Sequence, residues 1–233
     1  MAILLVPGFM LDADLWRDLV PALSKYGPAA YADLSKDSSI EAMASRALSE
    51  APPEFVLVGF SMGGYVAREI VRQAAGRVRA LVLIATSARS DSDVQRQRRD
   101  AIAGQTGSAV FKGLSRSAVV WSLHPDHAGR ADIIARIQSA GHRLGGDVFR
   151  RQSLIVRRDE REDLHLIRCP SLVIAGDEDR LRSRAEAIEL HQGLAGSQFE
   201  IIENTGHMVP MEAPQRLAAV IGEWLQQPGV GSR

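Results

Sequence analysis

The feature that most constrains the fold of this chain is a series of short apolar runs that do not alternate with polar residues. Most are four to six residues long and rich in Val, Ile and Leu. They are Ala2–Val6, Ala29–Ala32, Phe55–Val58, Ala80–Ala85, Leu172–Ala175 and Phe199–Ile202. Strands buried on both faces of a parallel sheet have this pattern, whereas a strand with one face in water alternates. The runs therefore predict a parallel sheet that is covered on both sides.

Amphipathic helical patterns lie between most of these runs. Apolar residues keep helical spacing at Leu15, Leu19 and Leu23, at Ile40, Met43, Ala44 and Ala47, at Val66, Ile70 and Val71, and from Leu217 to Leu225. Gly76 stands just past the third pattern, where helices commonly end, and Pro214 stands at a first helical position before the fourth. Strands that alternate with helices predict an α/β fold with a mostly parallel sheet and helices on both faces.

One long stretch, residues 86–167, contains no convincing strand. Its helical patterns are Asp93–Ala103, Ala109–Leu123, Arg130–Ala140 and Asp147–Val156, and they are separated by Gly107, Pro125 and the pair Gly145–Gly146. An all-helical block between two strands indicates an insertion over one end of the sheet. We therefore expect a core domain made of residues 1–85 and 168–233, and a helical cap made of residues 86–167.

Composition and charge exclude several classes of protein. The chain has 233 residues, 45% of them hydrophobic and 24% charged, which is ordinary for one globular chain with a full core. Lys+Arg and Asp+Glu are 28 each, so there is no chain-wide basic surface for nucleic acid. Cys169 is the single cysteine and forms no intramolecular disulfide. Pro7 and Gly8 interrupt the first apolar run, and no run approaches the roughly 18 residues of a membrane span. We expect a cytoplasmic protein with no nucleic-acid or membrane partner.

A Gly-x-Ser-x-Gly motif follows the third apolar run. It comprises Gly59, Ser61 and Gly63, and a helical pattern begins directly after it. In this strand–turn–helix context the turn lifts the serine hydroxyl above the end of the strand, and the helix amides present positive potential to an oxyanion. The motif alone occurs by chance, and a glycine-rich turn that only packs a helix on a strand is the alternative. The context favours Ser61 as a nucleophile.

A serine nucleophile needs a base, and His207 has the best position among six histidines. It follows the last apolar run, so it lies at the same carboxyl edge of the sheet as Ser61, where open α/β sheets build their sites. The alternative is a loop histidine that only packs. The segment His124-Pro125-Asp126-His127 suggests a metal site, but it lacks a third ligand and a solvated loop is favoured. His142 also falls in the insertion, and His165 and His191 are expected at the surface.

A carboxylate is needed to orient the base, and acids are concentrated after the fifth apolar run. Asp177, Glu178 and Asp179 follow Gly176 there, and spacing alone does not choose between Asp177 and Asp179. A solvated acidic loop or a helix cap accounts for the remaining acids. Asp91 and Asp93, which follow the preceding strand, are outside candidates.

The order Ser61, Asp179, His207, with a helical insertion before the acid, resembles the α/β-hydrolase superfamily from Ile3 to Leu225. The resemblance implies that Asp179 is the third member of a catalytic triad. Leu4–Phe9 resembles the strand and oxyanion loop of that family, which implies that the backbone amides of Phe9 and Met62 form an oxyanion hole, with Gly8 in the substrate-binding loop.

Two departures from the family pattern matter. Pro7 replaces the usual histidine before Gly8, which leaves the backbone donor in place but weakens assignment to one subfamily. The first hairpin of the family is also absent, so the sheet should have about six strands.

The resemblance implies a serine hydrolase. Ser61 would attack the carbonyl carbon of a small carboxylic ester, and water would hydrolyse the acyl-enzyme without metal or organic cofactor. Trp121, Leu123 and Phe149 are candidate pocket walls, although packing within the cap is the favoured explanation. Two alternatives stay open, namely a lactone or carbon–carbon bond hydrolase with the same triad and a non-catalytic small-ligand receptor. Substrate identity and oligomeric state are not predicted.

The balanced net charge conceals an uneven distribution. Residues 87–168 hold 15 basic and 10 acidic residues, so the remainder of the chain carries the matching acidic excess. The favoured explanation is that these arginines solvate the cap helices and dock the cap on the core. The alternative hypothesis is that they steer anionic esters toward Ser61.

Overall fold

A computed structural model describes residues 1–103 and 111–230. Its centre is one six-stranded sheet in the order β2-β1-β3-β4-β5-β6. The strands are β1 (Ala2–Val6), β2 (Ala29–Tyr31), β3 (Phe55–Phe60), β4 (Val78–Ile84), β5 (Ser171–Gly176) and β6 (Gln198–Ile202). All five pairings are parallel. The prediction of an α/β fold with about six mostly parallel strands is confirmed.

The three central strands are buried along nearly their whole length, which explains their apolar sequences. β3 and β5 are buried at every position, and β4 at all but Arg79. The strands all run in the same direction, so their carboxyl ends meet at one edge of the sheet. Ser61 follows β3 at that edge, and the register pairs Gly59 with Val6 and Phe60 with Ile84. The loops after β1, β3, β4, β5 and β6 therefore meet around Ser61.

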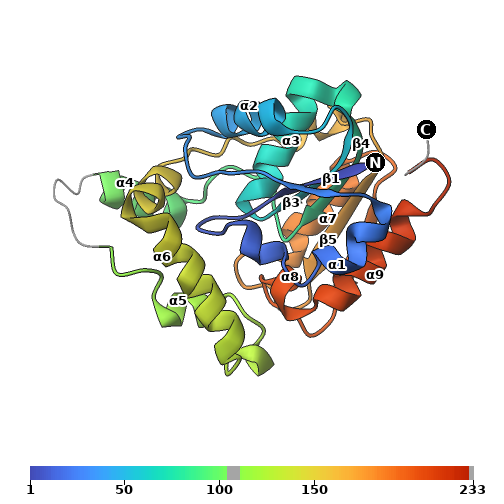
Figure 1. The fold of residues 1–233 in the computed structure, drawn as a ribbon. Helices are drawn as coiled ribbons and strands as arrows, with labels where there is room; N and C mark the ends of the chain where they lie inside the picture. The colour runs from blue at the N-terminus through green and yellow to red at the C-terminus, as the bar shows by residue number, and fades with distance from the viewer. Residues whose placement is uncertain (104–110, 231–233) are drawn as a thin grey trace.

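Helices cover both faces of the sheet (Figure 1). On one face, α2 (Ile40–Glu50), α3 (Met62–Ala74) and α7 (Arg184–Gly193) share an apolar core with the sheet. The other face packs against α1 (Val20–Leu23), α8 (Val209–Glu212) and α9 (Pro214–Leu225). The short 3-10 helices η1 (Ala13–Trp16) and η2 (Ser24–Tyr26) flank α1, and η3 (Ala75–Arg77) lies between α3 and β4.

The helical insertion, residues 86–167, contains no strand within its described part. Its elements are α4 (Asp93–Ala103), α5 (Arg116–Trp121), η4 (Pro125–His127), α6 (Ala131–Ser153) and η5 (Arg161–Leu166). In Figure 1, α4, α5 and α6 extend together from the end of the sheet opposite the N-terminus. Several of its apolar side chains, including Val119 and Ile133, belong to the same core cluster as α9. The insertion therefore extends the core rather than enclosing a separate one.

Three helix boundaries differ from the sequence predictions. The Leu15, Leu19 and Leu23 stripe is not one helix, because Pro21 lacks an amide donor and stands in the first turn of a new helix that begins at Val20. Gly76 does not terminate α3, which ends at Ala74 and leads into η3.

The helix expected over Ala109–Leu123 is the third difference. Residues 109 and 110 lie outside the described residues, and α5 begins only at Arg116. Gly113 has a left-handed φ of 85°, which interrupts a helix, and the Ser115 side chain caps α5 by accepting from the Ala118 amide. The patterns Arg130–Ala140 and Asp147–Val156 are helical from Ala131 and as far as Ser153, and they are merged in α6 across a break at Gly145, where φ is 78°.

Within residues 1–103 and 111–230, none of the helices has the length and apolar character needed to cross a membrane.

Candidate active site

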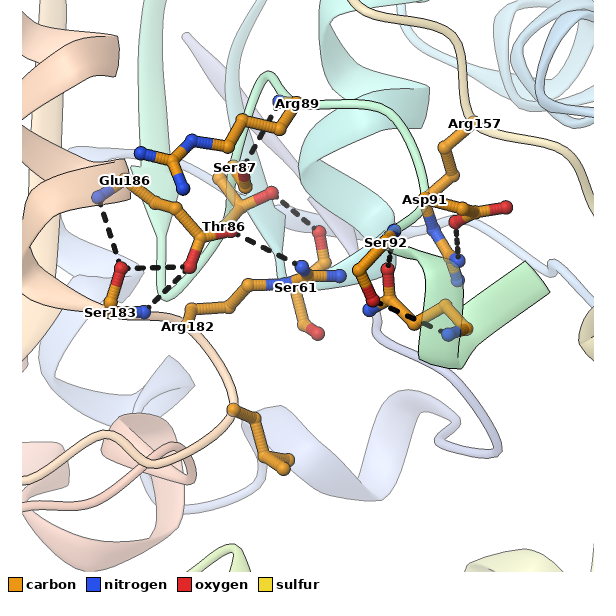
Figure 2. Close-up of polar contacts among 12 residues, drawn as sticks. Ser61, Thr86, Ser87, Arg89, Asp91, Ser92, Arg157, Arg182, Ser183 and Glu186 are labelled. Atoms are coloured by element: carbon orange, nitrogen blue, oxygen red, sulfur yellow. Dashed lines mark hydrogen bonds and ion pairs between the residues drawn. The ribbon is translucent and has the colours of Figure 1, made fainter. Parts of the chain in front are cut away.

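Ser61 occupies a strained turn between β3 and α3. Its φ of 53° and ψ of −116° lie outside the regions that a residue with a side chain ordinarily adopts. Neighbouring groups hold this conformation, because the Ser61 amide donates to the Ile84 carbonyl at 2.9 Å and the Thr86 hydroxyl donates to the Ser61 carbonyl at 2.7 Å. Figure 2 shows Thr86 beside Ser61. The turn leaves Ser61 partly exposed above the sheet.

The motif's glycine at position 63 is required by a close approach between α3 and the end of β1. A Cβ atom on Gly63 would lie 2.4 Å from the carbonyl oxygens of both Pro7 and Val6. These are backbone atoms, which cannot move aside as a flexible side chain can. A Cβ on Gly8 would likewise lie 3.3 Å from the Cβ of Ser61. The small residues therefore bring the loop after β1 directly against the nucleophile turn.

The structure brings His207 and Asp179 to Ser61. His207 Nε2 lies 2.9 Å from Ser61 Oγ, and His207 Nδ1 lies 2.8 Å from Asp179 Oδ2. The side chains of His207 and Asp179 are 7% and 2% exposed. A carboxylate accepts only, so Nδ1 carries the proton and Nε2 is left to accept the Ser61 hydroxyl proton. The arrangement can therefore deprotonate Ser61 and stabilise the imidazolium that forms.

Asp177, the competing acid, has a different location and partners. Its two carboxylate oxygens accept from the amides of Asn204 and Thr205, each at 2.9 Å. Burial raises the pKa of Asp177, but the hydrogen bonds from Thr205 and Asn204 outweigh burial and hold the pKa below 3.8. Asp177 therefore supports the loop that carries His207 without touching its imidazole.

The backbone near Ser61 supplies two amides that suit an oxyanion. Met62 is the first residue of α3, where an amide hydrogen has no acceptor within the helix. Phe9 directly follows Gly8, whose backbone lies close to Ser61, and it lines the same cleft as Ser61. The helix dipole of α3 adds positive potential at this end. That Phe9 and Met62 donate to an oxyanion stays a prediction.

Ser61 and His207 open into a cleft of about 610 Å³. Its walls come from the loop after β1, from α5 and α6 of the insertion, and from the segments after β5 and β6. They are Phe9, Leu11, Phe60, Leu114, Ser117, Ala118, Val119, Trp121, Ser122, Ile137, Leu181 and Met208. Most of these side chains are apolar, so the cleft suits a partly apolar small molecule.

The three candidate wall residues have different positions. Trp121 lines the cleft, is 55% exposed, and has the Arg180 guanidinium 4.8 Å above its ring. Leu123 is fully buried in the core. Phe149 is absent from the cleft wall and packs against Phe9, with ring centroids 5.7 Å apart. Packing therefore explains Leu123 and Phe149, and Trp121 alone contacts the cleft.

The remaining candidates for chemistry have structural partners. Asp91 is buried and pairs with Arg157 at 2.8 Å (Figure 2). It also pairs with Arg99, at 2.6 Å. Asp93 is exposed and pairs with Arg96 at the start of α4. Neither contacts His207.

The histidines outside the triad fall into two groups. His142 and His165 are exposed, and His191 is partly buried against Phe199. The loop of His124 and His127 is solvated at Pro125 and Asp126, but the two histidine side chains are only 12% and 15% exposed. The His127 ring lies against buried Glu212, whereas the His124 ring accepts from the Asp126 amide. No group of three metal-ligating side chains is found among residues 1–103 and 111–230.

Basic residues of the insertion dock it on the core. Arg143 of α6 pairs with Asp12 at 2.8 Å, and Arg136 pairs with Asp14 at 3.1 Å and with Asp18. Gln152 adds a neutral contact, since its Oε1 accepts from the Met10 amide at 2.8 Å. These contacts agree with electrostatic docking as the role of the basic insertion.

Sequence reasoning missed Glu212 and the cleft walls at Leu11, Ile137 and Met208. Glu212 had one visible signal, because it is an acid inside the otherwise apolar stretch from Met208 to Ala213. The wall residues gave no signal, since apolar residues in helices and loops are equally suited to a core.

A comparison with protein families matches residues 3–220 to the alpha/beta hydrolase family. Among curated relatives, the pimeloyl-(acyl-carrier protein) methyl ester esterase of Klebsiella pneumoniae is 36% identical over 93 residues, which span 36% of this chain and 36% of that esterase. The esterase of the same name from Neisseria meningitidis is 25% identical and covers 95% of this chain and 92% of its own length.

Solved structures give the same result for the fold. An esterase from Thermogutta terrifontis is 28% identical, with a TM-score of 0.78 over 97% of this chain and 89% of that one. An enol-lactonase from Burkholderia xenovorans is 21% identical, with a TM-score of 0.83 over 97% and 91% of the two chains. The second likeness shows the fold alone.

Proposed function

The chain belongs to the alpha/beta hydrolase family, and we propose that it is a serine hydrolase that cleaves a small carboxylic ester through Ser61, His207 and Asp179. The observation that carries the proposal is the continuous hydrogen-bond chain from Asp179 through His207 to Ser61, at 2.8 and 2.9 Å, with Ser61 open to an apolar cleft.

The mechanism follows from these contacts. His207 Nε2 takes the proton of Ser61 as its Oγ attacks the ester carbonyl carbon, and the proton then passes to the departing alcohol oxygen. The resulting acyl-enzyme is hydrolysed by a water molecule that His207 activates in the same way. Asp179 keeps the Nδ1 proton of His207 in place and stabilises the imidazolium.

The tetrahedral intermediates carry a negative oxygen, and we assign its stabilisation to the backbone amides of Phe9 and Met62. Each such donor contributes on the order of 3 kcal/mol to the transition state in serine hydrolases. Both residues border Ser61, and neither donor depends on the side chain at position 7, so Pro7 does not remove it.

We further propose that the helical insertion acts as the cap of this site and selects the substrate. α5 supplies Ala118, Val119 and Trp121 to the cleft, and α6 supplies Ile137. A volume of about 610 Å³ accommodates a small acyl group rather than a polymer. The named activity of the Klebsiella and Neisseria relatives, a methyl ester esterase, supports ester cleavage here.

The test is hydrolysis of short aryl esters together with labelling by a fluorophosphonate probe. The wild-type protein should turn over the esters and be labelled on Ser61, because only an activated serine reacts with the probe. Ser61→Ala should lose both while keeping its circular dichroism spectrum. Ser49→Ala, which removes an exposed hydroxyl that donates to the Arg46 carbonyl, is the matched control.

Substrate panels separate the alternatives. Turnover of lactones or of a carbon–carbon substrate without ester turnover would replace ester cleavage but keep the triad. A wild-type protein that neither hydrolyses esters nor reacts with the probe would favour the small-ligand receptor. Full activity in purified Ser61→Ala would contradict the proposed triad.

A further inference from the structure

The loop that carries His207 has five consecutive backbone amides, each with an acceptor outside the loop. Asp177 accepts from Asn204 and Thr205, as described above. The amides of Gly206 and Met208 both donate to Glu212 Oε1, at 3.0 and 3.1 Å. The amide of His207 itself donates to the Ser122 carbonyl at 2.8 Å. The base is therefore held by its backbone on both sides as well as by its ring.

Glu212 is the centre of this arrangement. Its side chain is 0% exposed, so its carboxylate oxygens depend on protein donors for solvation. While Oε1 faces the two amides that flank His207, Oε2 accepts from the His124 amide at 2.7 Å and lies 2.9 Å from His127 Nδ1. One carboxylate thus bridges the loop of the base and the insertion.

The contact between the loop and the insertion is close as well as polar. A Cβ atom on Gly206 would lie 2.5 Å from the His124 nitrogen and 2.9 Å from the Ser122 carbonyl oxygen. Ser122 and nearby Trp121 line the cleft that holds the substrate in the proposed function. A shift of this part of the insertion would therefore move the backbone of His207.

We propose that Glu212 is a positioning residue that couples the insertion to His207 and sets the distance between His207 and Ser61. It touches neither substrate nor the reacting atoms, and it acts through the amides of Gly206 and Met208. This inference rests on the proposed function, because it assigns Glu212 an effect on the same base.

The test compares Glu212→Leu with Glu212→Gln. Leucine removes every acceptor, so we expect kcat for a short aryl ester to fall about 100-fold, as small misplacements of catalytic groups do, while KM stays within about threefold. Glutamine keeps one acceptor oxygen for the amides of Gly206 and Met208. The kcat of Glu212→Gln should therefore be at least about tenfold higher than that of Glu212→Leu. The rate of fluorophosphonate labelling should follow kcat, because it needs the same approach of His207 to Ser61.

Two further variants separate positioning from stability. Glu160→Gln alters a carboxylate that is also buried but pairs with Arg68 and Arg72, so it should lower the melting temperature and leave kcat unchanged. His127→Ala removes one donor on the insertion side and should lower kcat about threefold, which keeps the proposal testable if Glu212→Leu does not fold.

A folded Glu212→Leu with kcat within twofold of wild type would overturn the inference. So would an unchanged kcat in folded His127→Ala, or a loss of kcat in Glu160→Gln equal to that in Glu212→Leu. The proposed function fails separately, through an active Ser61→Ala variant. If Ser61→Ala is inactive and Glu212→Leu is fully active, only the role of Glu212 is rejected.

Discussion

The Asp179 carboxylate lies 2.8 Å from Nδ1 of His207 and is almost fully buried. Its second oxygen accepts from the amides of Leu181 and Arg182, at 2.8 and 2.9 Å. Both oxygens are therefore occupied, and the carboxylate cannot turn away from the imidazole without losing two backbone hydrogen bonds. The carboxylate of Asp177, two residues earlier, instead accepts from two backbone amides of the loop that carries His207.

This difference predicts opposite effects for two similar substitutions. Asp179→Asn should lower kcat on the order of 10³- to 10⁴-fold, because an amide no longer fixes the tautomer of His207. Asp177→Asn should lower kcat less than about tenfold but reduce the free energy of unfolding by about 1–2 kcal/mol, since it loses one charged acceptor. Steady-state kinetics measures kcat, and urea unfolding measures the free energy of unfolding, for both variants. Equal kinetic losses would contradict the assignment of Asp179.

Gly63 should not tolerate a side chain. The Gly63→Ala Cβ would meet two backbone oxygens at 2.4 Å, so we expect a loss of about 3 kcal/mol or more in the free energy of unfolding. Gly76→Ala is the control, because a Cβ there meets nothing within 4 Å, and it should change stability by less than about 1 kcal/mol. Chemical denaturation of both variants measures the two free energies of unfolding. A Gly63→Ala protein as stable as Gly76→Ala would mean that α3 and the β1 loop do not pack this closely.

Cys169 should react slowly with thiol reagents in the folded protein. Burial raises the pKa of its thiol to about 11, so at pH 8 only about one molecule in a thousand carries the thiolate. Labelling by a disulfide reagent should be on the order of 100-fold slower than in the urea-unfolded chain. Between pH 8 and 10 the rate in the folded protein should keep rising, whereas that of the unfolded chain levels off near its ordinary pKa. A rate in the folded protein that levels off below pH 9.5 would disagree with the raised pKa.

The basic insertion should have little effect on the charge preference of the enzyme. Arg136 and Arg143 face core carboxylates, and Arg89 pairs with Glu189 at 2.5 Å, so these cations are already neutralised. We expect kcat/KM for an anionic ester and for a matched neutral ester to show similar dependence on NaCl between 20 and 500 mM, roughly the range over which screening of exposed charges becomes strong. A much steeper fall for the anionic ester would instead support steering of anionic substrates by the insertion.

The sequence pattern predicted the strands because burial on both faces demands uninterrupted apolar residues, as in β3 and β5. The pattern gave wrong helix boundaries where a single residue decides the backbone geometry. Pro21 divides the helix expected over Leu15, Leu19 and Leu23, and Gly113 delays the start of α5. The positions of Ser61 and His207 followed from strand ends. The choice between Asp177 and Asp179 did not, because a turn has no periodicity that tells which side chain faces inward. Glu212 was missed because its partners are backbone amides, which every sequence supplies.

The contacts of α6 with residues 10–18 affect the design of chimeras in which the helical insertion is replaced by that of a relative to change substrate preference. Gln152, Arg136 and Arg143 all attach to this short segment, which directly follows Phe9. A chimera that takes residues 86–167 from a relative and keeps the native residues 10–18 would place foreign side chains against Asp12, Asp14 and Asp18. The part of the protein that must be exchanged is therefore discontinuous in sequence. To transfer the substrate preference of a relative, residues 10–18 and residues 86–167 must be replaced together.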